Sequence, residues 1–329
     1  LELYRVLTFM MHLIDQYSRP ISILEEIADL ADEIHETFCT LEDPLARWNA
    51  TKDSLEKYRE RLKAGVSGKT VVFPANKTYA YLDQWFRVVM AGIDRAMRVS
   101  RSGLCPTYFA WTVTDYRKDE NGILPLAFER VDLPDFLEGQ VRYLRLHIPP
   151  EAKTALQEKV EQSALYDRKL DMLKVNADLA SAGYEVGRAH AFTPGWLENE
   201  SIWMHMEYKY LLELLRCGAY ERFSAYADTM LVPFLSAETY GRSLLENSSF
   251  IASSANPDPA THGRGFVARL SGSTAEFLSM WHLMMNGNRP MRVENGVLTL
   301  RLTPMLPARL TEGRTEIRAT LFGATRPTY

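Results

Sequence analysis

Apolar residues recur at intervals of three and four along most of the first 290 residues, which is the spacing of one buried face on an α-helix. Three such stripes lie in the first hundred residues, over 3–13, 24–38 and 82–97. Ser22 and Glu25 have the spacing of a capping box before the second stripe. Further helices are predicted at about 50–64, 150–163, 200–216, 219–232 and 273–286. The chain is therefore expected to be mainly α-helical.

Two regions depart from this period. Residues 104–117 are rich in aromatic and β-branched types, and Asn121-Gly122 separates them from a strand-like run over 123–130, which predicts a hairpin. Near the end of the chain, 297–302 and 315–322 alternate as strands do. Antiparallel helix pairs with long loops on one side predict part of an (α/α)6 barrel over residues 1–290. The start of a small β-sheet domain is predicted for 291–329.

Composition excludes several classes of protein. The chain has 38 basic and 42 acidic residues, a net charge of −4, which provides no electrostatic footprint for nucleic acid. No run of 18 apolar residues predicts a membrane span. The three cysteines form no CxxC pair, so we expect no disulfide framework, no metal site and a cytoplasmic location. Because the first residue is Leu1, we expect a piece of a longer polypeptide.

The best candidate for an anion site lies just before the predicted helix at 273–286. Ser271 and Gly272 come where free backbone N–H groups and the helix dipole favour a phosphate. A plain helix cap is the alternative. His205, near the start of another helix, could donate a hydrogen bond to a phosphate oxygen, or it could be a half-buried histidine of the core.

Other polar and aromatic residues gather in the same loops. Glu198, Glu200 and Glu207 could bind sugar hydroxyls or act in acid–base chemistry, or they could be the solvated start of a helix. Trp196 suits a sugar ring, with core packing as the alternative. Arg264 and Arg269 could clamp phosphate or pair with a carboxylate. The Walker, Rossmann, zincin and nucleophile-elbow motifs are all missing from the sequence.

Taken together, these loops resemble inverting glycoside phosphorylases of the cellobiose phosphorylase type, glycoside hydrolase family 94 and related β-glucan phosphorylases. The matching segments span about 191–290 and keep the spacing of the family motifs. They are Pro194-Gly195, Glu198-Asn199, Ile202, His205, Phe250-Ile251-Ala252, Pro257-Asp258, Gly263-Arg264 and Leu270-Ser271-Gly272-Ser273. The sequence departs from the family at Ser249, where the family has a Gln, and at Leu197, where it often has a Lys.

The resemblance implies the C-terminal part of a catalytic barrel and a glycosyltransferase reaction, the phosphorolysis of a β-linked glucan or disaccharide to α-glucose 1-phosphate with inversion. Inorganic phosphate would be the co-substrate, with no other cofactor. By the resemblance, His205, Ser271, Gly272 and Ser249 would bind phosphate. Glu198, Arg264 and Trp196 are the further candidates for substrate binding. The family's general acid is an Asp in a D-W-N-D-like segment, which this sequence lacks, so we expect it before Leu1.

Two other readings remain open. An inverting glycoside hydrolase of the same fold would use a carboxylate to activate water where a phosphorylase binds phosphate. A non-catalytic carbohydrate-binding segment would need neither. The expected partners are an oligosaccharide or disaccharide, phosphate and the rest of the polypeptide, without nucleic acid or membrane, and a homodimer is left open.

Overall fold

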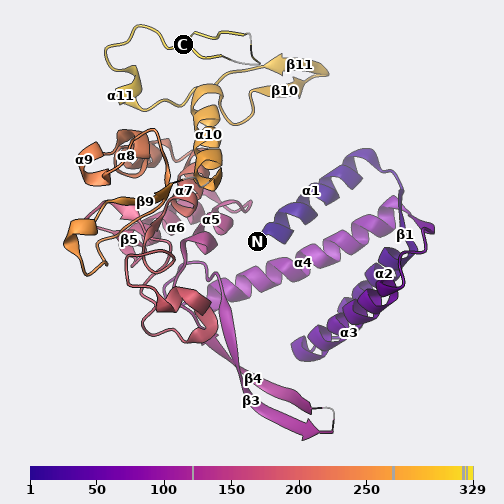
Figure 1. The fold of residues 1–329 in the computed structure, drawn as a ribbon. Coiled ribbons are helices and arrows are strands. Elements are labelled where there is room, and N and C mark those ends of the chain that lie inside the picture. The colour runs from indigo at the N-terminus through magenta and orange to yellow at the C-terminus, as the bar shows by residue number, and fades with distance from the viewer. Residues whose placement is uncertain (121, 269–270, 321–322, 324, 329) are drawn as a thin grey trace. The chain divides into compact units, whose positions relative to one another are not determined.

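The computed structural model describes residues 1–120, 122–268, 271–320, 323 and 325–328, without the side chains of Ala268, Ser271 and Arg309. In this part of the chain, eleven α-helices and several small antiparallel sheets make a mixed, mostly helical fold (Figure 1). The coarse class therefore agrees with the sequence prediction. No α/α barrel is visible among the described residues. None of their helices is both long and apolar enough to cross a membrane.

The chain divides into two compact units, Leu1–Val99 and Ser100–Tyr329, and each is described by itself. This division was not foreseen, and the predicted boundary near residue 290 stays a prediction. The first unit is a set of helices with one short antiparallel pair of strands. Its elements are α1 (Glu2–Tyr17), β1 (Ile21–Leu24), α2 (Glu25–Thr40), α3 (Pro44–Lys63), β2 (Thr70–Phe73) and α4 (Ala75–Val99).

In the first unit, α4 packs against α1 and α2, while α3 packs against α2. The aromatic rings of Tyr4 and Phe86 meet across α1 and α4 with their centroids 5.3 Å apart. The capping box predicted at Ser22 is wrong, because Ser22 lies in β1 opposite Val72 of β2. Helix α2 begins after that strand, at Glu25.

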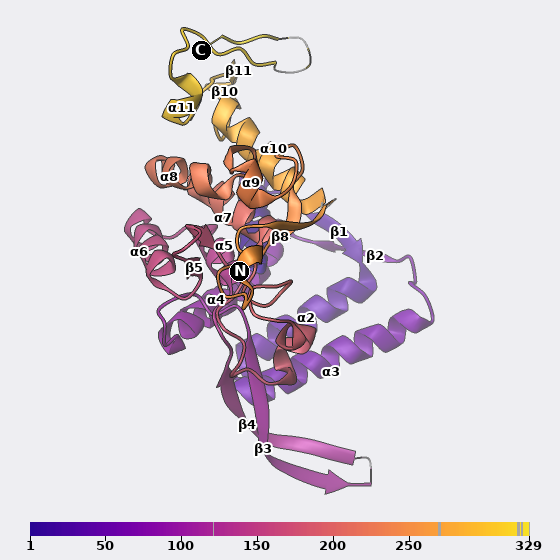
Figure 2. The ribbon, with the colours of Figure 1, turned by 60° about the vertical axis from the view of Figure 1, so that its left-hand side comes forward.

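The second unit opens with the predicted hairpin, now a long two-stranded ribbon of β3 (Phe109–Asp119) and β4 (Gly122–Asp132). Figures 1 and 2 show it extending away from the helices that follow it. Those helices and their connecting strands come next. They are α5 (Leu137–Leu144), α6 (Pro150–Gln162), β5 (Tyr166–Asp167), β6 (Met172–Leu173), the 3₁₀ helix η1 (Tyr184–Ala191), β7 (Ile202–Trp203), α7 (Met204–Arg216), α8 (Tyr220–Met230), η2 (Val232–Phe234) and α9 (Ala237–Tyr240).

Helix α7 is the centre of this unit, since most of its side chains are buried and it packs against α5, α8 and α10. The last elements are β8 (Ser248–Ile251), η3 (Pro259–Thr261), β9 (Gly265–Ala268), α10 (Ser271–Asn286), β10 (Met291–Glu294), β11 (Val297–Leu300) and α11 (Ala308–Thr311). The strand predicted at 297–302 corresponds to β11, which pairs with β10. The strand predicted at 315–322 is not formed over 315–320, where the structure has a single bridge from Arg318 to Thr328. Residues 321 and 322 lie outside the described part.

Candidate functional site

A three-stranded antiparallel sheet brings the loops with the candidate residues together in the order β7-β8-β9. Trp203 of β7 pairs with Phe250 of β8, and Phe250 pairs with Phe266 of β9. Helix α7 starts directly after β7, and α10 starts shortly after β9. The two helices pack against each other, as both views show (Figures 1 and 2). The sheet thus places the N-terminal ends of α7 and α10 near one another.

His205 is the second residue of α7, and its ring lies against Gly272, the second residue of α10. A Cβ atom added to Gly272 would stand 2.7 Å from His205 Nδ1 and 2.9 Å from both Cγ and Cε1. These nearly equal distances place the added atom over the Nδ1 side of the ring, so a face of the imidazole lies against the first turn of α10. N–H groups of a first helical turn have no intrahelical partner. His205 and Gly272 are therefore in contact, and their joint binding of a phosphate stays a prediction.

The prediction for Ser271 can be followed only in the backbone. Ser271 begins α10 and is bonded to Gly272, so its main chain lies beside the imidazole of His205. Its side chain is outside the described residues, as is the whole of Arg269. The contact of a Ser271 hydroxyl with phosphate stays a prediction.

Ser249 lies in β8, 5% exposed, one residue before Phe250. Because Phe250 pairs with Trp203, the register places Ser249 level with the start of α7, where His205 follows. Strand β8 also packs against α7. Ser249 is thus in the neighbourhood of the His205–Gly272 contact, although its short side chain reaches less far than the glutamine of the family.

Glu276 is the residue that the sequence analysis missed. Its Oε1 lies 3.6 Å from His205 Nε2, and its side chain is 18% exposed. The interaction with the imidazole of His205 holds the pKa of this carboxyl below its usual range, against the opposing effect of burial. Glu276 follows Gly272 by four residues on α10, so both lie on the face that meets His205. That spacing was the available signal.

The loop before β7 is firmly built and carries a strained backbone. Leu197 and Glu200 have φ of 50° and 56°, values that L residues rarely adopt. Asn176 supports the loop from outside, since its side chain donates to Glu198 O at 2.6 Å and accepts from Glu200 N at 2.7 Å. Such strained loops cluster at binding sites.

The candidate sugar-binding residues do not all gather at His205. Glu198 accepts a hydrogen bond from Arg188 Nη2 at 2.5 Å. Trp196 is half-buried, with its ring centroid 4.4 Å from that of Phe266 and 5.0 Å from that of Phe250. Arg264 extends its guanidinium over Gly241, after α9, where an added Cβ would stand 2.7 Å from Nη2. Their roles toward a sugar stay predictions.

Glu200 and Glu207 have structural partners. Glu200 pairs with Lys174 Nζ at 2.7 Å, and both side chains are nearly buried. Glu207 is fully buried, and its Oε1 accepts from Leu173 N at 2.9 Å. Its Oε2 has no hydrogen-bond partner among the described residues. Burial raises the pKa of Glu207 well above its usual range, so this carboxyl favours the neutral form.

We expect Glu207→Gln to flatten the dependence of stability on pH. Because the folded state binds its proton more tightly than the unfolded state, stability is lost as pH rises from the unfolded pKa toward the folded one. Each pH unit between those two values is worth about 1.4 kcal/mol. Glutamine keeps the acceptor for Leu173 and cannot ionise. Urea denaturation at pH 5 and pH 8 should show the variant gaining stability relative to the parent at pH 8, and parallel curves for the two proteins would contradict this.

Asp167 joins the loop after β8 to the β5–β6 turn. Its Oδ1 accepts from Lys169 N at 3.1 Å, Leu170 N at 3.2 Å and Ser254 Oγ at 2.7 Å. Its Oδ2 accepts from Ser254 N at 2.6 Å. The same loop carries Ser253, whose N–H donates to Gly195 O at 3.2 Å. Asp167 thereby supports the loop on which the Pro194–His205 segment rests.

Replacing Asp167 by alanine should cost about 2–4 kcal/mol of unfolding free energy, because it leaves four part-buried donors without their acceptor. Urea denaturation measures this cost. Asp178→Ala is the matched control, since the exposed Asp178 accepts a single local bond, from Ala180 N at 2.8 Å. An equal loss of unfolding free energy in the two variants would contradict a stabilising role for the hydrogen bonds of Asp167.

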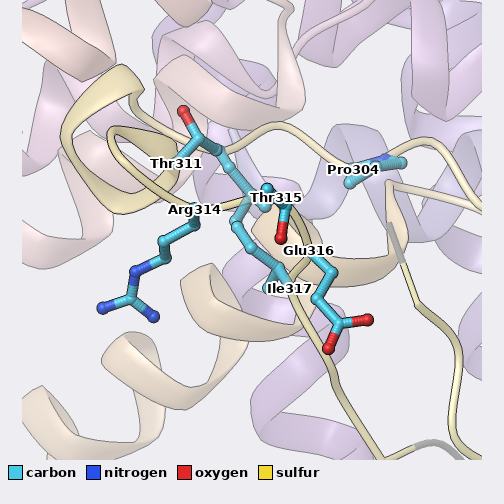
Figure 3. Close-up of a pocket in the computed structure, with 7 residues that line it drawn as sticks. Pro304, Thr311, Arg314, Thr315, Glu316 and Ile317 are labelled. Carbon is cyan, nitrogen blue, oxygen red and sulfur yellow. The ribbon is translucent and has the colours of Figure 1, made fainter.

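Other features of the second unit offer less chemistry. A cavity of about 310 Å³ is lined by Pro304, Leu306, Thr311, Arg314, Thr315, Glu316 and Ile317. In Figure 3 its two charged side chains, Arg314 and Glu316, extend in different directions rather than converging on one ligand. Among the described residues no group of three His, Cys, Asp or Glu side chains is placed to hold a metal ion.

No family model matches the sequence, and no curated protein is significantly similar to it. The resemblance to glycoside phosphorylases therefore depends on the motifs of the sequence alone and stays a prediction.

Proposed function

We propose that this chain forms the phosphate-binding part of an inverting glycoside phosphorylase. The observation that supports it best is the contact between the imidazole of His205 and Gly272 at the start of α10. A helix N-terminus attracts anions through its dipole and its unpaired N–H groups. An imidazole at the same point adds a polar side chain that can share a proton with phosphate. These are the positions that the family motifs assign to phosphate.

The barrel belongs to the same proposal. Helices α5, α8 and α10 pack around α7, and loops with the family motifs lie at one end of α7 and α10. We propose that they are part of an (α/α)6 barrel whose other helices come from the rest of the polypeptide. The general acid, an Asp in the family, would come from there too. The chain 1–329 alone is then expected to release no glucose 1-phosphate.

A phosphorylase and a hydrolase differ in what attacks the anomeric carbon. In the phosphorylase, phosphate in the His205–Gly272 cradle attacks with inversion and the general acid protonates the leaving oxygen. An inverting hydrolase needs a carboxylate that activates water. The Glu276 carboxylate, 3.6 Å from His205, is the observation that keeps the hydrolase as the second candidate.

Phosphate dependence of glycan cleavage by the full-length protein separates the candidates. β-Linked glucans of several linkages and chain lengths are incubated with and without phosphate, and products are read by ¹H NMR for α-glucose 1-phosphate. Product that forms only with phosphate supports the phosphorylase. Free inverted sugar without phosphate supports the hydrolase. Binding without cleavage under both conditions leaves a carbohydrate-binding role.

A further inference from the structure

Cys39, in the last turn of α2, has a base and an orienting amide within reach. Its Sγ lies 3.7 Å from Nε2 of His35, one helical turn earlier. Gln84 comes from α4, which packs against α2. Its Nε2 donates to Cys39 Sγ at 3.0 Å, and its Oε1 lies 2.6 Å from His35 Nδ1. A nucleophile, a base beside it and a third group that holds the base are the parts of an activated thiol.

The orientation of the Gln84 amide decides which nitrogen of the neutral His35 ring carries the proton. Gln84 Nε2 lies 3.3 Å from the backbone oxygen of His35, which can only accept, so this end of the amide must be the NH₂ group. The other end is then the oxygen, and His35 Nδ1–H donates to it. The Nε2 lone pair is left facing Cys39, whose S–H can donate to it and pass its proton there.

The surroundings of His35 favour the charged form of its ring. Tyr81 of α4 stacks on the imidazole, with centroids 3.9 Å apart and planes at 16°. The Tyr81 hydroxyl donates to Asp32 Oδ1 at 2.7 Å, and Lys77 Nζ lies 2.9 Å from the same oxygen. Burial opposes ionisation of Asp32, but its hydrogen bonds to Lys77 and Tyr81 outweigh burial and lower its pKa. An ionised carboxylate one turn before His35 stabilises an imidazolium.

The surroundings of Cys39 include one opposing and one favourable charge. The C-terminal end of a helix disfavours an anion, and Cys39 lies in the last turn of α2. Arg47 of α3 adds a positive charge at this end, because its Nη2 and Nε donate to Leu41 O at 2.6 and 3.0 Å. The guanidinium after Cys39 and the carboxylate before His35 thus have the signs that suit a thiolate–imidazolium pair.

The other two cysteines lack this combination of exposure and a base. Cys105 is buried, and burial raises the pKa of its thiol to about 12. Cys217 is half-buried, and burial raises the pKa of its thiol as well. Cys39 is exposed. A reagent in solution should therefore distinguish Cys39 from both of them.

We propose that Cys39 is a site of reversible thiolation by small disulfides, with His35 as its base. Cys39 gives its proton to His35 Nε2, and its sulfur attacks one sulfur of the disulfide. A new S–S bond forms at Cys39 while the S–S bond of the reagent breaks, and the departing thiolate takes the proton from His35. The products are a mixed disulfide and one small thiol. This site lies in the first unit and is independent of the proposed function.

Dithiodipyridine, an uncharged disulfide, tests the proposal on the whole chain, because the thiopyridone that it releases is coloured. After a limiting dose, peptide mass spectrometry should find the label on Cys39, and Cys39→Ser should remove the fast phase of thiopyridone release. At pH 7, His35→Gln should slow this phase by about tenfold or more, since a positioned base contributes at least that much. His12→Gln, at an exposed histidine of α1, is the matched control and should react as the parent does.

Raising the pH separates a base from a merely structural histidine. At about pH 10 hydroxide ionises exposed thiols without help, so the parent and His35→Gln should react within about twofold of each other. Equal rates at pH 7, or a tenfold gap that persists at high pH, would overturn the role of His35 as a base. Label spread evenly over the three cysteines, or a fast phase that survives in Cys39→Ser, would overturn the site itself.

Discussion

Gly272→Ala should weaken phosphate binding by about a hundredfold while leaving the fold intact. The new Cβ would stand 2.7 Å from His205 Nδ1, which is closer than nonbonded atoms approach, so the imidazole must leave its place. The methyl group would also occupy the space in front of the first turn of α10. Losing two contacts to phosphate, at about 1.5 kcal/mol each, amounts to two decades of affinity at about 1.4 kcal/mol per decade.

The fold should tolerate this change, because Gly272 is in a helix and alanine is the better helix former by about 0.5–1 kcal/mol. Gly92→Ala in α4 is the matched control, since a Cβ at Gly92 meets nothing within 4 Å. Calorimetric titration with phosphate measures binding, and thermal unfolding measures stability. If phosphate affinity in Gly272→Ala stayed within threefold of the parent, phosphate would not bind at this turn.

The helices were predictable from sequence because their apolar period is local. The apolar stripe over 82–97 lies in α4 (Ala75–Val99), and the helix predicted at 150–163 corresponds to α6 (Pro150–Gln162). The strand pair β1–β2 was not predictable in the same way. Ser22 has the local signature of a helix cap, but pairing with Val72, fifty residues later, decides its conformation. Long-range pairing overrides local preference wherever a segment is short.

In the candidate site too, local sequence spacing identified some residues, whereas helix packing determined the surroundings of others. His205 and Gly272 were found because fixed motif spacing marks them, and the structure brings them into contact. Glu207 was also predicted as a candidate site residue, but its position in α7 buries its side chain. It follows His205 by two residues on α7, which turns it to another face and into the core.

Glu276 illustrates the converse case. Its position four residues after Gly272 predicts a shared helix face. Only the packing of α7 on α10 reveals that this face meets His205. A sequence motif can therefore identify a candidate anion site without revealing a neighbouring charge such as the Glu276 carboxylate. Under the proposed function, that charge would bear on the choice between phosphate and water as the attacking group.

His205→Ala tests the cradle from the side of α7. Removing the ring removes one hydrogen bond to a charged ligand, worth roughly 1.5–3 kcal/mol, so the phosphate concentration for half-maximal rate should rise tenfold or more in the full-length protein. Affinity for the sugar should change less, because the candidates for sugar binding are other residues, Glu198 and Trp196 among them. Initial rates of glucose 1-phosphate release over a phosphate series give the first quantity. Calorimetric titration with the sugar gives the second.

His205→Gln sharpens the test, because glutamine keeps a side chain of similar reach and can donate, but cannot take up a proton. If the ring acts only by filling space, His205→Gln should bind phosphate nearly as the parent does. If the imidazole itself is needed to hold the phosphate, the glutamine variant should require about tenfold more phosphate, as His205→Ala does. A phosphate requirement that is the same in the parent, His205→Ala and His205→Gln would place the phosphate elsewhere, and the cradle at α10 would then be a helix start capped by a core histidine.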